Sequence, residues 1–364
     1  MGWLADALAV VVGAAIALGT VLSAVATFVV PRGVPARLTR FVFRASRRLF
    51  DVRVRMARTY EAGESVIAWY APLTLVALVG VWFLLLITGF TLIFRGLGVA
   101  SWELAIETAG SSLTTLGFVP VTGLARQLVA FVVAALGLLL LALLISYLPT
   151  IYGAFQRREA LVTRAAMQAG SPPSGVTLLC RFHAISGFEA LESQVWQPWV
   201  TGFVDIEESH TSLASLPFFR SPRPDRHWVT AAGAVLDAAA LRASTVDLPR
   251  QPSAELCIRS GYLALRHIGD FYGIGYDADP QRGDAISITR EEWEQARRVL
   301  GEAGVPLRAD VEEAWLDFCG WRVNYDTVLL TMAGLVMAPY APWISDRGST
   351  RRHRPPLRRR HVAS

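Results

Sequence analysis

The sequence predicts an all-α membrane protein, and three observations lead to that fold class. Of its 364 residues, 53% are hydrophobic and only 18% are charged, whereas soluble domains carry about 25% charged residues. Residues 7–30, 65–94 and 127–156 contain no charge, and each segment exceeds the roughly 20 residues that a helix needs to cross a bilayer. After residue 157 helical spacing dominates, and no alternating strand pattern is sustained. We therefore expect three membrane helices followed by an α-helical domain.

The first element, residues 1–31, is predicted to be a membrane helix and not a cleaved secretory signal. Its first residues include Asp6 and no basic residue, whereas a signal peptide begins with positive charge. The apolar run that follows is also longer than the hydrophobic region of a signal peptide. The sequence therefore favours a helix that stays in the membrane.

The arginine content of the loops predicts the orientation of the three spans. All 35 basic residues are arginine, and nine of them lie between the first two spans, whereas the next loop contains only Arg95 and Arg126. Positively charged loops stay in the cytoplasm, so we expect the N-terminus and the 96–125 loop outside and the C-terminal region inside. Arginine in place of lysine, with abundant alanine, fits a GC-rich bacterial genome. The expected location is therefore a bacterial plasma membrane.

Residues 32–64 are predicted to form a basic amphipathic helix on the cytoplasmic membrane surface. Apolar residues recur there at spacings of three and four, namely Leu38, Phe41, Ala45, Leu49, Val52 and Met56. The arginines expected to contact the bilayer and its anionic headgroups are Arg37, Arg40, Arg44, Arg47 and Arg48. The pattern is typical of a helix lying in the membrane interface.

The same arginines allow a second interpretation. Arg37, Arg40, Arg44 and Arg47 have the spacing of gating charges in a voltage sensor. A sensor helix needs neighbouring membrane helices with counter-charges, and only one span precedes this segment. The interfacial interpretation is therefore favoured.

The loop between the second and third spans has the most distinctive pattern. Ser101 can cap a short helix whose early turns contain Glu103 and Glu107. A dozen helical residues reach only about 18 Å, which is less than a full span. We expect this helix to end before an extended Thr114–Phe118 segment. Irregular backbone at membrane depth is tolerated only where protein encloses it or where it lines a water path.

A span, a short helix, Thr-Thr-Leu-Gly-Phe and a second span together resemble the pore module of the potassium channel superfamily in its two-transmembrane form. The resemblance covers residues 65–156, with membrane helices at 66–94 and 127–150 and a pore helix with filter at 101–119. It implies a ring of backbone carbonyls that replaces the hydration shell of a permeant K⁺ or other monovalent cation. One chain supplies one quarter of such a ring, so the implied partner is a homotetramer.

The resemblance also implies a role for each filter residue. Thr115 would offer its hydroxyl and carbonyl at the inner site, with Thr114 at the cavity entrance, and Phe118 would brace the filter from behind. Gly117 suits a backbone with positive φ. The implied ion-binding residues are Thr114, Thr115, Leu116, Gly117, Phe118 and Val119.

The filter departs from the family at its outer end. Val119 stands where the family has a second glycine, and Pro120 follows where an acid is usual. A β-branched residue at positive φ is strained, so we expect the outermost site to differ in shape. The alternative functions are a non-conducting membrane-anchored scaffold or sensor on the same helix pair and, third, a membrane-anchored enzyme.

The third span contains two candidate gating hinges. Gly137 lies near its middle and Pro149 near its inner end, where the channel family bends to open its inner gate. Glycine and proline are also common in membrane helices for other reasons, glycine often for close packing. Both interpretations remain open from the sequence.

Residues 157–345 are predicted to form a helical cytoplasmic domain that regulates or assembles the pore, followed by an arginine-rich disordered tail at 346–364. The helices are expected at 176–195, 226–245, 253–271, 289–303 and 309–336, with a capping box at Thr289–Glu292. Scattered histidines and distant cysteines provide no metal, cofactor or catalytic signature. We therefore expect no enzyme activity, no resident metal or cofactor and no nucleic-acid partner.

Overall fold

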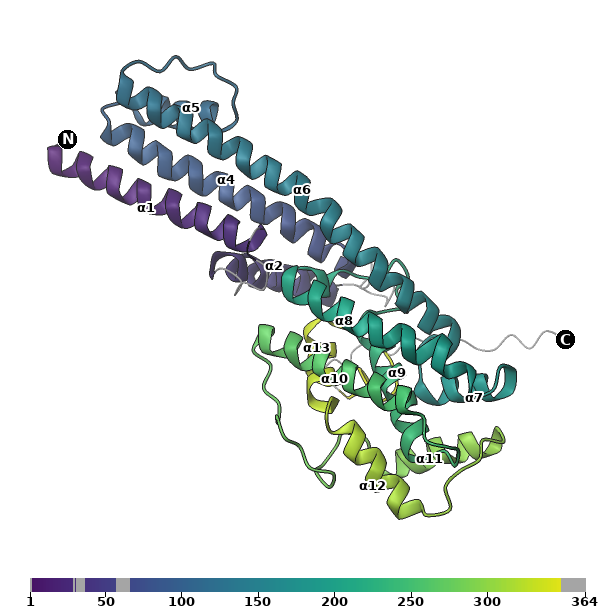
Figure 1. The fold of residues 1–364 in the computed structure, drawn as a ribbon. Coiled ribbons are helices and arrows are strands. Elements are labelled where there is room, and N and C mark those ends of the chain that lie inside the picture. The colour runs from purple at the N-terminus through teal and green to yellow at the C-terminus, as the bar shows by residue number, and fades with distance from the viewer. Residues whose placement is uncertain (1, 29, 31–36, 57–65, 348–364) are drawn as a thin grey trace. The chain divides into compact units, whose positions relative to one another are not determined.

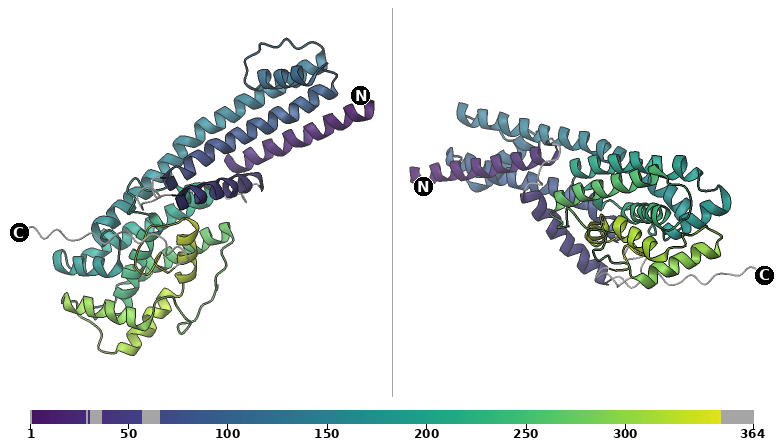
Figure 2. Two further views of the ribbon diagram at one scale, coloured as in Figure 1. Left: turned by 180° about the vertical axis from the view of Figure 1, so that it is seen from behind. Right: turned by 60° about the horizontal axis from the view of Figure 1, so that its bottom comes forward.

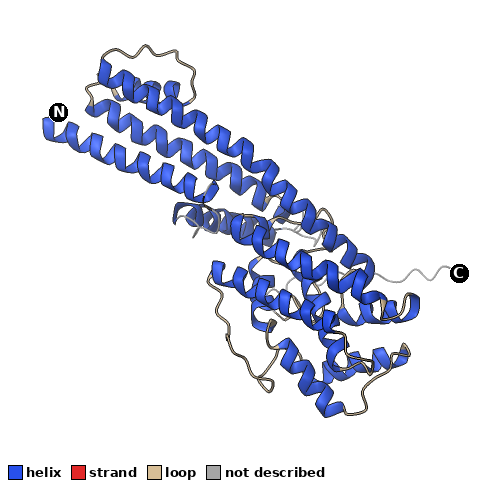
Figure 3. Ribbon diagram, in the orientation of Figure 1, coloured by secondary structure: helices blue, strands red, loops and turns tan. Residues whose placement is uncertain are grey.

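The computed structural model describes residues 2–28, 30, 37–56 and 66–347. These residues form helices and loops without a named strand (Figure 3). They divide into two compact units (Figure 1). The first unit contains the described residues of Met1–Val52, Trp69–Gly153 and Ser212–Ser215, and the second contains the other described residues. The all-α class expected from the sequence is confirmed for the described chain.

The first unit is built from long apolar helices and two shorter ones. In chain order these are α1 (Trp3–Phe28), α2 (Arg37–Met56), α4 (Tyr70–Gly96), α5 (Trp102–Leu113) and α6 (Leu124–Ala169), whose last residues belong to the second unit. Three of them, α1, α4 and α6, are long and apolar enough to cross a membrane. The expected spans are thus present as helices, and the third is longer than the predicted 127–150 segment.

Helices α1 and α4 run side by side in opposite directions (Figure 2). A Cβ atom on Gly13 would lie 2.4 Å from the carbonyl oxygen of Gly89, and one on Gly96 would lie 2.4 Å from that of Asp6. Small residues therefore let the two backbones touch, as they do in membrane helix pairs. Near the other end of the pair, the indole of Trp82 donates a hydrogen bond to Ser23 Oγ (3.3 Å).

The second unit is a bundle of shorter helices. They are α7 (Gly175–Ile185), a π-helical turn η1 (Glu192–Trp196), α8 (Gln197–Ser212), a 3₁₀ turn η2 (Leu216–Phe218), α9 (Trp228–Ser244), α10 (Pro252–Tyr272), α11 (Arg290–Glu302), α12 (Val311–Arg322) and α13 (Asp326–Leu335). The capping box predicted at the start of α11 is present, since Thr289 and Glu292 exchange both hydrogen bonds.

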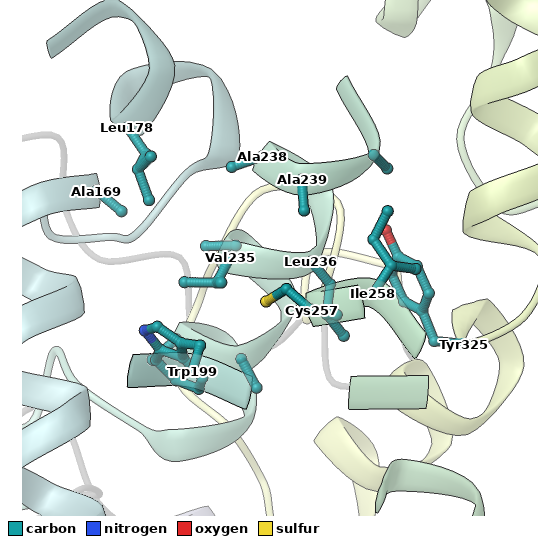
Figure 4. Close-up of a cluster of buried hydrophobic side chains, with 14 of the residues drawn as sticks. Ala169, Leu178, Trp199, Val235, Leu236, Ala238, Ala239, Cys257, Ile258 and Tyr325 are labelled. Atoms are coloured by element: carbon teal, nitrogen blue, oxygen red, sulfur yellow. The ribbon is translucent and has the colours of Figure 1, made fainter. Parts of the chain in front are cut away.

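Helix α9 is the centre of this bundle. Every one of its residues except Ala243 is buried, and α7, α10, α12 and α13 pack around it. Figure 4 shows Val235 and Leu236 of α9 among Cys257 and Ile258 of α10. The many alanines of α9 allow the surrounding helices to approach closely. Larger side chains from those helices, such as Trp199 of α8, fill the remaining space.

A buried ionic network joins α9 to α12 and α13. Arg322, which is fully buried, donates Nε to Asp326 Oδ1 (2.7 Å) and forms an ion pair with Asp237 on α9. Tyr325 donates its hydroxyl to Asp237 Oδ1 (3.0 Å), and Ser287 donates its hydroxyl to Asp326 (2.7 Å). Each charge of this network thus has a partner of opposite sign, which offsets the cost of burial.

Two predicted helices differ from the structure, and one observed helix was not predicted. The segment 176–195 is not one helix. Gly187 has a φ of 74°, and its N–H donates a hydrogen bond to Phe182 O that terminates α7. The segment 309–336 is two helices, α12 and α13. Helix α8 was not predicted at all. Of the predicted tail, Arg347 is held by Glu292 (2.6 Å), and residues 348–364 lie outside the described residues.

Candidate functional site

The candidate site is the chain that follows α5. Ser101 caps α5 as expected by accepting a hydrogen bond from Leu104 N (3.1 Å). At the other end, the Thr114 hydroxyl donates to Gly110 O (2.7 Å), and the Thr115 hydroxyl donates to Thr114 O (2.7 Å). The partial negative charge at the C-terminus of a helix therefore lies directly before the predicted filter residues.

The expectation of an extended chain from Thr114 onward is wrong for its first two residues. Thr114 and Thr115 form a turn, and Thr115 has a φ of 59°. A left-handed conformation costs a non-glycine residue roughly 1–2 kcal/mol. The strain predicted at Val119 is absent, since Val119 does not have a positive φ. Gly117 does have one (68°), as expected for this position.

Three consecutive N–H groups converge on one residue of α5. Leu116 N and Gly117 N donate to Ser111 O at 3.0 and 3.4 Å, and Phe118 N donates to Ser111 Oγ at 3.1 Å. The sign of φ alternates along residues 115–118, and such alternation turns successive N–H groups toward a common point. Ser111 thus organises the segment. This role was not predicted, and the only sequence signal for it is the Ser111-Ser112 pair near the end of α5.

The carbonyl groups of the same segment are left without donors. None of the residues that the structure describes donates a hydrogen bond to the carbonyl oxygens of residues 115–118. In the single chain Leu116 is 70% exposed and Phe118 is 63% exposed. The expected bracing of the filter by Phe118 therefore has no counterpart within one chain. The segment presents carbonyl oxygens on a surface that the chain itself does not cover.

The loop that contains the site is tied to the ends of both flanking helices. Arg126, near the start of α6, donates Nε to Leu97 O (3.0 Å) and Nη2 to Gly98 O (2.9 Å). These acceptors follow the C-terminus of α4, where carbonyls lack helical partners and a cation is favourable. Arg126 thus joins the end of α4 to the start of α6.

The two hinge candidates have different surroundings. A Cβ atom on Gly137 would lie 1.9 Å from Leu113 O, so a glycine is required for α6 to approach the end of α5. Close packing therefore explains why position 137 is a glycine. The same contact places α6 against Leu113, the residue that precedes the candidate segment. Pro149 lies inside α6, which continues as helix on both sides of it. Bending at either residue remains a prediction.

The predicted membrane-contact arginines lie on α2. Arg40, Arg44 and Arg48 are exposed, and Arg47 pairs with Asp51 (3.2 Å). Arg37 begins the helix, and its side chain lies outside the described residues. Among the described side chains, those of Arg40, Arg44 and Arg48 are therefore accessible to a headgroup.

An apolar stripe lies beside these arginines. Phe41, Leu49, Val52 and Met56 are between 57% and 72% exposed. The other side of α2 packs on α4, where the ring of Tyr70 contacts Phe43 and Phe50 and its hydroxyl donates to Phe43 O (3.2 Å). Helix α2 thus presents apolar and basic side chains together on its uncovered surface.

Other candidate chemistry is sparse in the part of the chain that the structure describes. No group of three or more His, Cys, Asp or Glu side chains there could hold a metal ion. The three cysteines are free. Gly273, with a φ of 71°, is the C-cap of α10, so the Gly273–Gly275 segment serves as a turn. No protein-family model, no curated protein and no solved structure matches this chain.

Proposed function

We propose that this chain is a subunit of a potassium-channel-like pore that conducts K⁺ or another monovalent cation. One observation carries the proposal: the N–H groups of residues 116–118 are directed at Ser111, while the carbonyls of residues 115–118 have no donor among the described residues. Carbonyl oxygens freed in this way can replace the water around a cation. The C-terminal end of α5 adds favourable potential at the same place.

The proposed pore requires a symmetric assembly. One chain carries one candidate segment, and four copies around an axis would complete a ring of carbonyls. The exposed apolar surface of the single chain supports this step. In the most apolar 18-residue stretch of α6 only 17% of the residues are buried, and Leu116 and Phe118 of the candidate segment are exposed. Neighbouring copies and lipid would cover these apolar surfaces.

In this proposal α1, α4 and α6 cross a bacterial plasma membrane with the N-terminus and α5 outside. The arginine-rich α2 lies on the inner surface, with its apolar stripe in the acyl region and its arginines on anionic headgroups. The second unit is then cytoplasmic and regulates or assembles the pore. The arginine distribution between the loops supports this orientation.

The proposal is tested by recording from the purified protein in planar bilayers with opposing K⁺ and Na⁺ gradients. Gly117→Ala places a side chain at a φ of 68° in the candidate segment. Gly123→Ala is the matched control, because Gly123 also has a positive φ (91°) and open space around it but lies outside the segment. We expect a cation current that Gly117→Ala reduces about tenfold or more and Gly123→Ala leaves nearly unchanged.

Two outcomes contradict the pore. The first is the absence of current from folded tetramers in the bilayer. The second is a current that both glycine variants change to the same extent. Either result moves the assignment to the non-conducting scaffold or sensor built on the same helices.

A further inference from the structure

The second unit contains a cleft that the proposed pore does not use. Its volume is about 280 Å³, just below the range of about 300–1,000 Å³ that is usual for ligand pockets. The C-terminal end of α9 and the start of α10 contribute to its wall, together with the loops that follow α9 and α11. The charged and aromatic side chains that line it are Arg242, Arg250, Glu255, Arg308, Asp317 and Trp321.

Arg242 is the buried cation of this cleft. It is only 5% exposed, and its Nη2 donates to the neutral carbonyl of Pro249 (2.8 Å). Its Nε is buried and has no acceptor among the described residues. No carboxylate in the described chain lies within ion-pair distance of its guanidinium group. Burial without a counter-charge also lowers the pKa of Arg242.

The two acids of the cleft are already paired with other arginines. Glu255 accepts two hydrogen bonds from Arg250 (2.6 and 2.5 Å). Asp317 accepts from Arg308 (2.7 Å) and from Arg282 (2.6 Å). The carboxylates therefore balance their own partners. Arg242, whose guanidinium lies 5.9 Å from the centroid of the Phe188 ring, keeps a positive charge without a carboxylate partner.

The contrast with Arg322 shows what Arg242 lacks. Both guanidinium groups are buried, but Arg322 is paired with two carboxylates, while Arg242 lies beside an open cleft. An isolated buried charge is unfavourable unless an anion or several hydrogen bonds compensate it. A guanidinium group presents paired N–H donors that match a phosphate or a carboxylate.

We propose that this cleft binds a small organic anion, whose phosphate or carboxylate group pairs with Arg242 and whose planar body lies against Trp321. The volume restricts the ligand to about the size of a mononucleotide or smaller. The site goes beyond the proposed pore and does not depend on conduction, since binding is measured on protein in detergent without any current.

The test uses full-length protein in detergent and three anion probes: inorganic phosphate, adenosine 5′-monophosphate and benzoate. Adenosine and benzyl alcohol are the matched neutral compounds. Thermal unfolding and titration calorimetry report binding. We expect saturable binding of adenosine 5′-monophosphate, benzoate or both, and none of the neutral compounds. The relative affinities of the two organic anions then separate a phosphate ligand from a carboxylate ligand.

Arg242→Met tests the residue that carries the inference. We expect at least an approximately tenfold loss of affinity for the bound probe. Arg259→Met, at an exposed position of α10 that does not line the cleft, is expected to bind as the unmodified chain does. Without ligand, Arg242→Met is expected to be no less stable than the unmodified protein, because it removes a buried charge that has no carboxylate partner.

Three results overturn the inference. One is the absence of saturable binding of all three anions up to about 10 mM. Another is equal affinity in Arg242→Met. The last is a tenfold or greater fall in the folding equilibrium constant of unliganded Arg242→Met with unchanged anion binding, which would make Arg242 a purely structural support for Pro249.

Discussion

Helices α6 and α9 are both apolar, yet their surroundings are opposite. Helix α9 is buried along its whole length by other helices of the second unit. In α6, large apolar side chains such as Leu138 and Ile145 are 57% and 69% exposed. A helix that is apolar all round is stable only inside a protein core or a membrane. The covering of α9 is therefore internal to the chain, whereas that of α6 must come from lipid or from other copies.

The comparison separates two sources of stability within one molecule. Around α9, stability comes from burial of apolar surface within the chain itself, and the buried charge of Arg322 is matched by two carboxylates. Around α6, contact of the exposed leucines with water is unfavourable. A bilayer or neighbouring subunits would supply the favourable contacts instead. Substitutions in the two helices should therefore have different consequences.

The largest effect is expected from a charge placed in α9. Leu236→Asp buries a carboxylate among apolar side chains, since Leu236 is fully buried. We expect it to destabilise the second unit by on the order of 5 kcal/mol or more. Leu138→Asp, at an exposed position of α6, should leave the unfolding of the second unit unchanged. Urea unfolding followed by tryptophan fluorescence measures both, and equal destabilisation would contradict the comparison.

A slightly smaller effect is expected from removal of the charge that α9 shares with its neighbours. Arg322→Met leaves Asp237 and Asp326 buried without their cation, at a cost of about 3–5 kcal/mol. Arg282→Met is the matched control, because Arg282 also pairs with two carboxylates, Glu313 and Asp317, but is exposed. The control should change the free energy of unfolding by about 0–1 kcal/mol. Similar losses in both variants would argue against burial as the cause.

Acidification should act on the two histidines packed at the start of α9. Burial holds the pKa values of His210 and His227 well below 6.5. The positive charge of Arg158 adds to this effect at His210, and those of Arg220 and Arg158 add to it at His227. The unfolded chain therefore binds more protons than the folded chain as the pH falls below about 6.5. The stability contributed by the neutral rings is complete above that pH and is lost on further acidification, by up to about 1.4 kcal/mol per pH unit for each histidine.

This pH dependence is measured by thermal unfolding between about pH 7.5 and pH 5. The double variant His210→Gln, His227→Asn has no titratable group at either position. Asn at position 227 can still cap α9, as His227 does by accepting a hydrogen bond from Val229 N (3.3 Å). We expect the variant to have a flatter profile below about pH 6.5. An unmodified protein without acid-dependent loss, or a variant that keeps it, would refute the assignment.

The smallest effect is expected at a helix end outside α9. Thr289→Ala removes the capping hydrogen bond to Glu292 N (3.3 Å) at the start of α11, at a cost of about 1 kcal/mol. Thr289→Ser keeps the hydroxyl and should recover most of this loss. A cost above that of Arg322→Met would show that the periphery, and not the surroundings of α9, limits the stability of the second unit.

Local signals predicted those parts of the fold that depend on local chemistry. The charge-free runs predicted α1, α4 and α6, and the capping residues Ser101 and Thr289 marked the starts of α5 and α11. The break between α12 and α13 was not visible, because no proline or glycine marks it and the residues around it are ordered by Arg322. In the candidate segment, Gly117 was expected at a positive φ, but the turn at Thr115 and its support by Ser111 depend on contacts between non-adjacent residues.

The sequence by itself determined the all-helical class, the three apolar helices, the asymmetric distribution of arginine and the position of the Thr-Thr-Leu-Gly-Phe segment, since hydrophobic period, charge and capping act over a few residues. Only the tertiary structure decided that α9 is covered and α6 is not, that Gly137 approaches Leu113, and that Arg242 is buried without a carboxylate. These features depend on which distant residues meet, and a linear pattern carries no distances between them.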